Sequence, residues 1–378
     1  MIGLPSEVGP IRPPSESQSL LIRVSRNCPW NRCLFCPVYK NETFSLRKLN
    51  DLVNEITALS EIKNKLQNLL KSESFYTLST NLGKYFQSEE FEDAHRLLHW
   101  LYHRNYTVFL QDADPLFRKK GELYEILNAI KKCFPETTRI TAYSRASTIS
   151  RFSLPELVNL RSLGLTRIHT GLESGSQAVL SMVKKGVKQD DFILAGKMLS
   201  EANIEFSLYV MPGLGGRAYS KEHSSETAYV INQANPSFVR FRTLGLNPLM
   251  PLYQLYKKGL FEILSEEGMV TEIKTMIEQI DVETAIYSDH NLNLLMDING
   301  FLPRDKTRML KIIDNFFSLS DNLRLKFIIA RRLNLVFELN EFLSFDLSDQ
   351  INDIYETLKA LPAEQREEWF LKNRSKSL

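Results

Sequence analysis

Between residues 20 and 243, short apolar runs alternate with longer segments in which apolar residues recur every three or four positions. Short runs rich in β-branched and aromatic residues are typical of buried strands, whereas the longer period is typical of amphipathic helices. The pattern predicts six strands, at residues 20–25, 106–111, 139–143, 167–172, 204–211 and 237–243. Because each strand is followed by a helical segment, we expect a parallel sheet buried under helices.

The helical segments between these strands complete six strand–helix units. The predicted helices cover residues 45–71 (as one helix or two), 88–103, 116–133, 154–163, 176–201 with a break at Gly186, and 222–233. Six such units predict an α/β fold in the form of a partial (β/α)6 barrel of the TIM-barrel kind. A flat doubly wound sheet is the alternative arrangement of the same units.

The chain divides into three predicted regions. Residues 1–19 are rich in proline, which blocks regular structure, so they form an irregular lead-in. Residues 20–250 form the barrel. The strand signals then stop, and residues 251–378 are predicted to form a mostly helical C-terminal region.

The composition is that of an ordinary globular protein, with 43% hydrophobic residues, 24% charged residues and a net charge of +2. This balance gives no strong nucleic-acid signal, because nucleic-acid binding usually needs a concentrated basic face. No run approaches the ~20 apolar residues needed to span a bilayer. Residues 1–19 also lack the apolar core of a signal peptide. We therefore expect a cytoplasmic protein without a membrane partner.

Three of the four cysteines, Cys28, Cys33 and Cys36, fall in one short segment directly after the first predicted strand. Thiolates are soft ligands that suit iron–sulfur clusters and zinc. Three cysteines leave one iron of a [4Fe–4S] cluster without a protein ligand, whereas structural zinc usually takes four protein ligands. No histidine lies near this loop in the sequence to supply a fourth. The loop is expected at the C-terminal mouth of the sheet, where α/β barrels place their active sites.

The cysteine loop resembles the signature of the radical S-adenosylmethionine (SAM) superfamily, Cys-x3-Cys-x2-Cys with an aromatic residue before the last cysteine. Phe35 supplies the aromatic residue, and the first gap is one residue longer than usual. The resemblance covers about residues 18–250 and is closest to an uncharacterised group of single-domain members. It implies that Cys28, Cys33 and Cys36 bind a [4Fe–4S] cluster whose open iron binds SAM.

The resemblance also implies a reaction. Reductive cleavage of SAM yields a 5′-deoxyadenosyl radical, which abstracts hydrogen from a substrate in an oxidoreductase- or lyase-type enzyme. An external electron donor such as flavodoxin or ferredoxin is then needed. The cofactors carry this chemistry, and the protein positions them. The sequence does not identify the substrate, which can be a small molecule or a macromolecule.

Candidate SAM contacts follow the ends of the predicted strands. Residues 167–176 resemble the family's fourth-strand motif, which implies that Glu173 binds the ribose hydroxyls or the ammonium group of SAM. Lys185 is a candidate partner for the SAM carboxylate. The residues that the resemblance places at the cofactors are Phe35, Asp112, Asp114, Tyr143, Arg145, Glu173, Ser174, Lys185, Met211 and Gly213.

Asp112 and Asp114 stand where many family members carry a motif that contains a glycine pair. Either carboxylate is able to accept from the SAM ammonium group. The alternative is that they cap a turn ahead of the next helix. Both roles are compatible with the sequence.

Two groups outside these motifs are candidates for substrate binding. Arg240 and Arg242 alternate on the sixth predicted strand, so their side chains would share one face and form an anion site if that face is inward. Asp289 and His290 would either reach over the barrel mouth or form a turn that packs the C-terminal helices.

Two other functions use the same cysteines. A zinc-stabilised binding module, for RNA among other partners, would hold zinc through the three cysteines and a histidine. A sensor or electron-transfer protein would bind the cluster without turnover.

Overall fold

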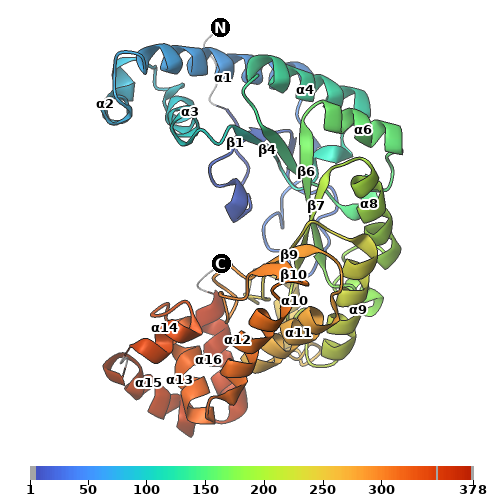
Figure 1. Ribbon diagram of the computed structural model, residues 1–378, viewed down its shortest axis with the longest axis vertical. Coiled ribbons are helices and arrows are strands. Elements are labelled where there is room, and N and C mark those ends of the chain that lie inside the picture. The colour runs from blue at the N-terminus through green and yellow to red at the C-terminus, as the bar shows by residue number, and fades with distance from the viewer. Residues whose placement is uncertain (1–5, 346–347, 376–378) are drawn as a thin grey trace. The chain divides into compact units, whose positions relative to one another are not determined.

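An eight-stranded sheet forms the centre of the fold (Figure 1) in the computed structural model, which describes residues 6–345 and 348–375. The strand order along the sheet is β1-β4-β5-β6-β7-β8-β9-β10. The strands are β1 (Leu20–Arg23), β4 (Thr107–Gln111), β5 (Arg139–Tyr143), β6 (Leu165–Glu173), β7 (Glu205–Val210), β8 (Phe238–Phe241), β9 (Thr284–Tyr287) and β10 (Gly300–Leu302). Neighbouring strands pair in parallel from β1 through β4 and β5 to β6, and from β7 through β8 to β9. Strand β10 is antiparallel to β9.

The predicted α/β fold, a partial barrel followed by a mostly helical region, is confirmed. All six predicted strands are present near their expected positions. The first is shorter than predicted, because Ser25–Arg26 forms a separate strand, β2, which pairs antiparallel with β3 (Ser45–Leu46). The helix predicted from residue 45 therefore begins only at Leu49.

The expectation that strands end near residue 250 is wrong, because β9 and β10 extend the sheet beyond β8. They contain only four and three residues. Runs this short carry too few apolar positions for periodicity to separate a strand from a loop. Ala285 and Ile286 are buried because β9 pairs with β8, a contact that local sequence does not show.

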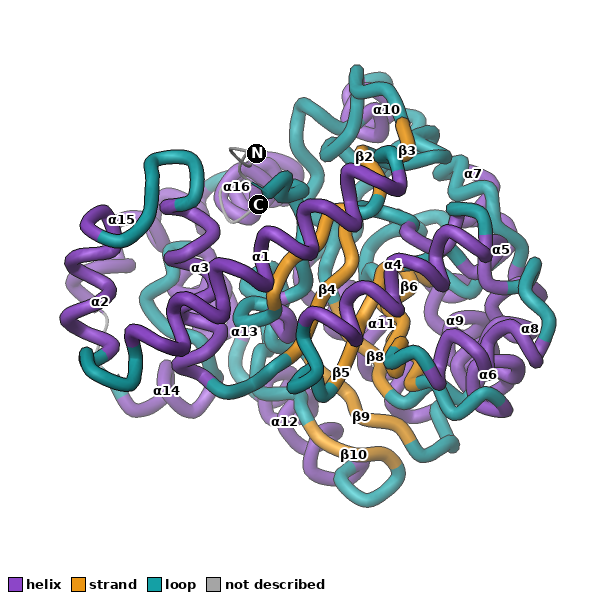
Figure 2. The backbone as a smooth tube through the Cα atoms, turned by 90° about the horizontal axis from the view of Figure 1, so that it is seen from above, coloured by secondary structure: helices purple, strands orange, loops and turns teal. Residues whose placement is uncertain are grey.

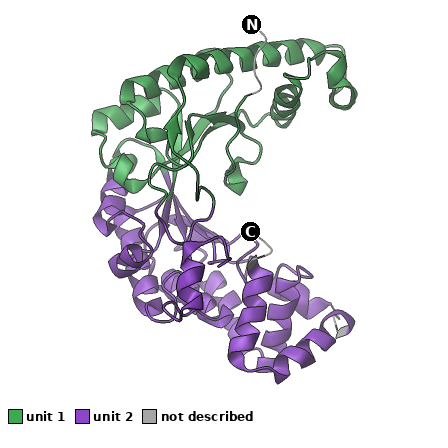
Figure 3. Cartoon of the chain, turned by 180° about the vertical axis from the view of Figure 1, so that it is seen from behind, with its two compact units in different colours: residues 1–31, 38–170, 198–205 green, residues 32–37, 171–197, 206–378 purple. Residues whose placement is uncertain are grey.

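The chain forms two compact units (Figure 3): unit 1 consists of residues 1–31, 38–170 and 198–205, and unit 2 of residues 32–37, 171–197 and 206–378. The predicted boundary at residue 250 stays a prediction. Of the helices that the structure describes, not one combines the length and apolar character needed to cross a membrane.

In unit 1, helices cover one face of the strands. The main helices are α1 (Leu49–Leu69), α2 (Phe75–Asn81), α3 (Phe91–His103), α4 (Lys120–Cys133), α5 (Ala146–Ile149) and α6 (Leu154–Ser162). Helices α1 and α4 pack together over β4 and β5 (Figure 2). Val108 and Leu110 on β4 and Ala142 on β5 are fully buried, as expected on a helix-covered face.

The N-terminal segment of unit 1 has one short regular element, the 3-10 turn Pro14–Glu16, and is anchored to the strands by polar contacts. The Gln111 amide on β4 bonds the backbone of Gly9 and Ile11, with distances of 2.6–3.3 Å. Glu16 is completely buried and accepts from Arg139 on β5 at 3.0 Å. These contacts order a proline-rich segment whose composition alone predicts irregular structure.

Unit 2 contains the remaining helices. They are α7 (Gln177–Met182), α8 (Gln189–Glu201, whose last four residues belong to unit 1), α9 (Ser220–Ala234), α10 (Pro251–Lys257), α11 (Glu266–Gln279), α12 (Lys306–Ser318), α13 (Asp321–Arg332), α14 (Leu339–Ser344), α15 (Ser348–Ala360) and α16 (Ala363–Ser375). Helix α11 packs on α9 and α12, and α13 packs on α14, α15 and α16.

A buried ionic cluster joins three of these helices. Glu266 at the start of α11 accepts hydrogen bonds from Arg332 of α13 at 2.5–2.7 Å and from Arg374 of α16 at 2.7–3.1 Å. Burial alone would raise the pKa of Glu266, but the two guanidinium groups outweigh it and lower the pKa to about 2. Arg374 also donates to the carbonyl oxygen of Leu244 at 3.1 Å, which ties the last helix to the segment after β8.

We expect Arg374→Ala to destabilise the protein by about 3 kcal/mol, because it leaves a buried carboxylate short of one of its two partners. The measurement is the free energy of unfolding in urea. Lys372→Ala is the matched control, since Lys372 lies on the same helix and is exposed. Equal losses for the two variants would contradict the structural role of the cluster.

Candidate functional site

The cysteine loop is closed at its base by its own polar contacts within unit 1. Strands β2 and β3 pair at its two ends. Just inside them, the Asn27 side chain donates to the Thr43 carbonyl oxygen at 2.7 Å, and the Asn31 side chain donates to the Tyr39 carbonyl oxygen at 2.5 Å. Asn27 and Asn31 both have positive φ, at 66° and 42°, a conformation in which asparagine is enriched.

Cys28 lies between these two asparagines and already accepts a backbone hydrogen bond. The Asn31 N–H group points to its Sγ atom at 3.4 Å. This hydrogen bond orients the Cys28 sulfur relative to the loop backbone.

Cys33 and Cys36 belong to unit 2. The backbone between them is held on both sides: Leu34 N–H donates to the Val183 carbonyl oxygen, and Leu252 N–H donates to the Leu34 carbonyl oxygen, both at 2.9 Å. Phe35 is buried, and its ring lies 5.4 Å from the Lys185 ammonium group. The predicted aromatic position thus anchors the second half of the loop.

The donor set fits an iron–sulfur cluster chemically, since thiolates are its usual ligands and none of the three cysteines is in a disulfide. Among the residues that the structure describes, no set of three or more His, Cys, Asp or Glu side chains is grouped to hold a metal ion. The joint ligation by Cys28, Cys33 and Cys36 therefore stays a prediction.

Asp112, which follows β4, is completely buried and holds the base of the cysteine loop. Its carboxylate accepts from the Arg23 guanidinium at 2.6 and 3.0 Å, from Asn27 N–H at 3.1 Å and from the Tyr39 hydroxyl at 2.7 Å. Asn27 precedes the first cysteine, and Tyr39 follows the last. A Cβ atom on Gly9 would come within 2.4 Å of the same carboxylate, so the N-terminal segment closes over it. This geometry favours a structural role, and contact with SAM stays a prediction.

Asp114 is also fully buried, but it serves the next strand. It accepts from the hydroxyls of Ser144 at 2.7 Å and Thr148 at 2.6 Å, which joins the end of β4 to the start of α5. Burial raises the pKa of Asp114 to about 6, although both hydroxyls and the Arg145 charge oppose the shift. These contacts agree with the alternative in which Asp114 caps a turn. Contact between Asp114 and SAM stays a prediction.

Tyr143 and Arg145 follow β5 and are both half-buried. The Tyr143 ring packs edge-on against Phe109 at 5.1 Å. The Arg145 guanidinium lies over the Trp30 ring at 5.0 Å, so it touches the cysteine loop within unit 1. Trp30 was not selected from the sequence, and its place between the first two cysteines is the signal that identifies it.

Glu173 and Lys185 form an ion pair in unit 2, with 3.1 Å between Lys185 Nζ and Glu173 Oε1. Glu173 ends β6 with a φ of 63°, a left-handed conformation that is unusual for glutamate. A Cβ atom on Gly171 would collide with the Glu173 carboxylate, so glycine is required there. Two residues that the resemblance assigns to SAM are thus adjacent.

Ser174 joins a buried polar cluster with His223 of α9 and Glu272 of α11. The Ser174 hydroxyl lies 2.8 Å from His223 Nδ1, and His223 Nε2 lies 3.6 Å from Glu272 Oε2. Glu272 also accepts from Gly213 N–H at 2.6 Å. The sequence prediction missed His223 and Glu272 as members of this cluster. Each is a polar residue at a position of its helix that otherwise carries apolar residues, and this feature of the sequence could have identified it.

Burial sets the protonation of this cluster. It lowers the pKa of His223 to about 4, and it raises the pKa of Glu272 to about 8 against the opposing bonds from Ser220 and Gly213. At neutral pH the histidine is therefore neutral and the glutamic acid is protonated. Since all three side chains are buried, the arrangement links β6, α9 and α11 without a charge.

Met211 and Gly213 follow β7 and complete the set of predicted SAM residues. Met211 is half-buried, and its N–H donates to the Glu173 carbonyl oxygen at 2.9 Å. Gly213 has a φ of 87°, and a Cβ atom there would lie 2.8 Å from the Met269 sulfur. Glycine is thus required by close packing on α11.

The arginines near β8 differ in exposure, and the anion site that they would form on an inward face stays a prediction. Arg240 is buried, stacks on Tyr287 at 4.4 Å and lies 3.4 Å from Asp289. Arg242, which follows the end of β8 at Phe241, is exposed. Burial, with the nearby Arg242 charge, lowers the pKa of His290 to about 4.

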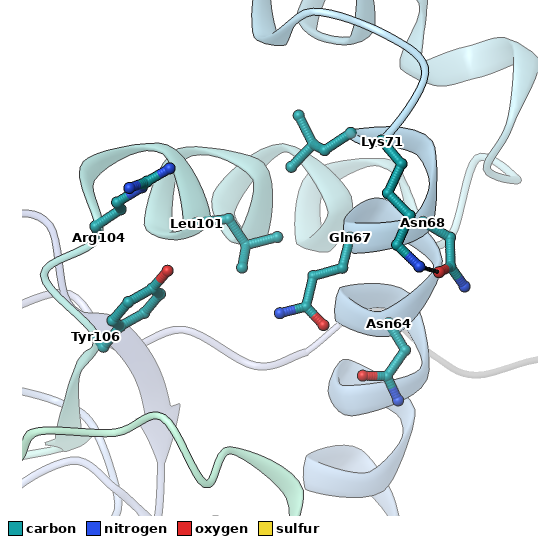
Figure 4. Close-up of a pocket in the computed structure, with 8 residues that line it drawn as sticks. Asn64, Gln67, Asn68, Lys71, Leu101, Arg104 and Tyr106 are labelled. Atoms are coloured by element: carbon teal, nitrogen blue, oxygen red, sulfur yellow. Dashed lines mark hydrogen bonds between the residues drawn. The ribbon is translucent and has the colours of Figure 1, made fainter.

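An open depression of about 610 Å³ in unit 1 contains none of the predicted site residues (Figure 4). Helix α1 contributes three amide side chains to its wall, and Lys71, which follows the helix, also lines it. Its lining consists of Asn64, Gln67, Asn68, Leu70, Lys71, Leu101, Arg104 and Tyr106.

The wild type is expected to lose stability as the pH rises toward 8, and Glu272→Gln should abolish this pH dependence. A glutamic acid whose pKa rises from 4.5 to about 8 on folding stabilises the fold fully below pH 4.5, and this contribution disappears as the pH rises through 8. Between pH 6.5 and 8 the wild type should lose about 2 kcal/mol more than the variant, since one pKa unit corresponds to about 1.4 kcal/mol.

The measurement is urea unfolding of both proteins at several pH values in that window. Both proteins contain His223, so its titration in the unfolded state cancels in the comparison. Parallel curves for the two proteins would contradict a buried, protonated Glu272.

Comparison with known proteins finds partial matches to curated relatives. The tRNA uridine(34) acetyltransferase of Methanocaldococcus infernus is 25% identical over 119 residues, which is 31% of this chain and 22% of that protein. The heme chaperone HemW of Bacillus subtilis is 22% identical over 163 residues, 43% of this chain and 42% of that protein. The chain thus matches less than half the length of each.

Among solved structures, coproporphyrinogen III oxidase (HemN) from Escherichia coli is similar with a TM-score of 0.45 at 13% identity. The similarity covers 69% of this chain and 51% of that one. The sequence profile of the Radical SAM superfamily matches residues 22–224, which is more than half of the 378 residues. The chain belongs to the radical SAM superfamily.

Proposed function

We propose that this protein is an enzyme that binds a [4Fe–4S] cluster through Cys28, Cys33 and Cys36, together with SAM. The observation that carries the proposal is a loop with three cysteines outside any disulfide, anchored by backbone hydrogen bonds, in a member of the radical SAM superfamily. When bound, the cluster and SAM supply a 5′-deoxyadenosyl radical that abstracts hydrogen from a substrate.

The residues of the chain have positioning tasks in this proposal. The Asn31 N–H group orients the Cys28 sulfur. The Lys185–Glu173 pair presents one cation and one anion side by side, and these charges suit the carboxylate of SAM and its ammonium or ribose groups. The Lys185 ammonium group lies over the Phe35 ring, which keeps Lys185 next to the loop that contains Cys33 and Cys36.

We also propose that a small electron-transfer protein, such as flavodoxin or ferredoxin, delivers the electron. The substrate class is open: the acetyltransferase and heme-chaperone activities of the relatives belong to proteins that this chain matches over less than half their length. The competing functions, a zinc-stabilised module and a sensor without turnover, make different predictions for metal content and SAM cleavage.

Anaerobically purified wild type is expected to contain about four irons per chain. Cys33→Ala should reduce this to background, because a cluster with two protein ligands is not retained. Cys133→Ala is the matched control, since Cys133 lies on α4 away from the loop sequence, and it should keep its iron.

Iron content is measured by elemental analysis, and release of 5′-deoxyadenosine is measured after adding SAM and dithionite. One zinc and no iron in the wild type would overturn the proposal in favour of the zinc module. A cluster with no detectable SAM binding would favour the sensor.

Asp112→Asn should lower iron retention several-fold although residue 112 is not a ligand. Asparagine keeps the size of the side chain but loses the charge that pairs with Arg23. It also loses one of the two oxygens that accept from Asn27 N–H and from the Tyr39 hydroxyl. The base of the cysteine loop should then loosen, which limited proteolysis detects. Asp114→Asn is the control, because Asp114 is also fully buried but accepts from the Ser144 and Thr148 hydroxyls. Equal iron loss in both variants would indicate general damage to the core instead.

A further inference from the structure

Helix α3 carries half of the histidines in the chain on one face. His95, His99 and His103 are spaced by four residues, which places their side chains one above the other along the helix. All three lie in unit 1, and the proposed cluster chemistry uses none of them. Two histidines four residues apart on a helix are a known geometry for binding one metal ion.

The ring geometry separates the two possible pairs. The rings of His95 and His99 are 4.6 Å apart between centroids and are tilted by 55°. Those of His99 and His103 are 6.2 Å apart and nearly parallel, at 25°. Imidazole nitrogens bind zinc at about 2.0–2.1 Å, so the closer and tilted pair is better able to direct two nitrogens at one ion.

The nitrogens of this pair are available. Among the described residues, none forms a hydrogen bond with the ring of His95 or His99, whereas buried His223 has the Ser174 hydroxyl. Burial, and then the charges of His95 and His103, lower the pKa of His99, which favours the neutral ring that binds metals. Phe75 packs edge-on against His99 at 5.2 Å and restricts its orientation.

Two arginines, Arg12 and Arg96, line the cavity beside the histidines, and the one on α3 is paired with a carboxylate. Arg96 lies next to His95 in sequence, but its guanidinium is paired with Asp93, which is buried at the start of the helix. Arg96 also donates to the Ser6 hydroxyl at 2.6 Å. Its charge is therefore neutralised within the chain.

A cavity of about 220 Å³ opens beside the histidines. The three rings line it from α3, and Ser17 and Gln18 line it from the N-terminal segment. His95 is exposed and His99 is half-buried, so a hydrated ion has access from solvent. The volume leaves room for water on the coordination positions that the protein does not fill.

We propose that His95 and His99 form a binding site for a divalent first-row transition ion such as Ni²⁺ or Zn²⁺, separate from the cysteine loop. Imidazole suits these ions, and two protein ligands leave the remaining positions to water. A metal ion at this site is not part of the cluster. The total metal bound per chain should therefore exceed the iron bound per chain when both sites are filled.

The test is isothermal titration of the full chain with NiCl2. Wild type is expected to bind one ion at the histidine pair. His95→Ala and His99→Ala should each weaken this binding at least tenfold, because the loss of one of two imidazole ligands removes the chelate. His103→Ala should change the binding by less than about twofold. All variants keep the same cysteines, so thiol binding cancels in the comparison. His99→Gln, which keeps a polar side chain, replaces His99→Ala if that variant does not fold.

The iron content of the histidine variants should equal that of the wild type, and Cys33→Ala should keep the histidine-dependent nickel binding. The two proposals are therefore tested independently, and a negative result for the cluster does not exclude the histidine site. Nickel binding that is unchanged in both His95→Ala and His99→Ala would overturn the proposal. An equal loss in His103→Ala would overturn the assignment to the His95–His99 pair.

Discussion

The buried Asp112 carboxylate is the constraint on which the candidate site depends. It lies at the end of β4, yet its partners are Arg23 on β1, Asn27 before the first cysteine and Tyr39 after the last. Burying a charge is costly unless it is paired and hydrogen-bonded, so this carboxylate stabilises the fold only when all its donors are in place. The core of unit 1 and the base of the cysteine loop are therefore ordered together.

The sequence predicts the parts of this arrangement that are local. Six strands and the spacing of Cys28, Cys33 and Cys36 follow from residue patterns within short windows. The partners of Asp112 are some 70 to 90 positions away, and no periodicity encodes them. The strand β9 is missed for the same reason, because pairing with β8 and not its own sequence makes it a strand.

Strand alternation separates two sets of side chains within each unit. In unit 1, Val108, Leu110 and Ala142 are buried under helices, whereas the intervening positions carry Phe109 and Tyr143. In unit 2, the register places Tyr209, Arg240 and Tyr287 side by side on β7, β8 and β9. One set of positions in unit 1 thus packs against the helices, and the other set carries aromatic side chains.

Two equally buried glutamates on the same helix differ in charge because only one of them has cationic partners. Glu266 and Glu272 both lie on α11 and are about equally buried, at 1% exposure each. Two guanidinium groups lower the pKa of Glu266 to about 2, whereas Glu272, which faces a neutral histidine and the Gly213 N–H group, has a pKa of about 8. The ionised residue fixes the C-terminal helices to the rest of unit 2, and the protonated one closes the core beneath the turn after β7. Because the two residues are six positions apart in one sequence, only the structure assigns them these opposite states.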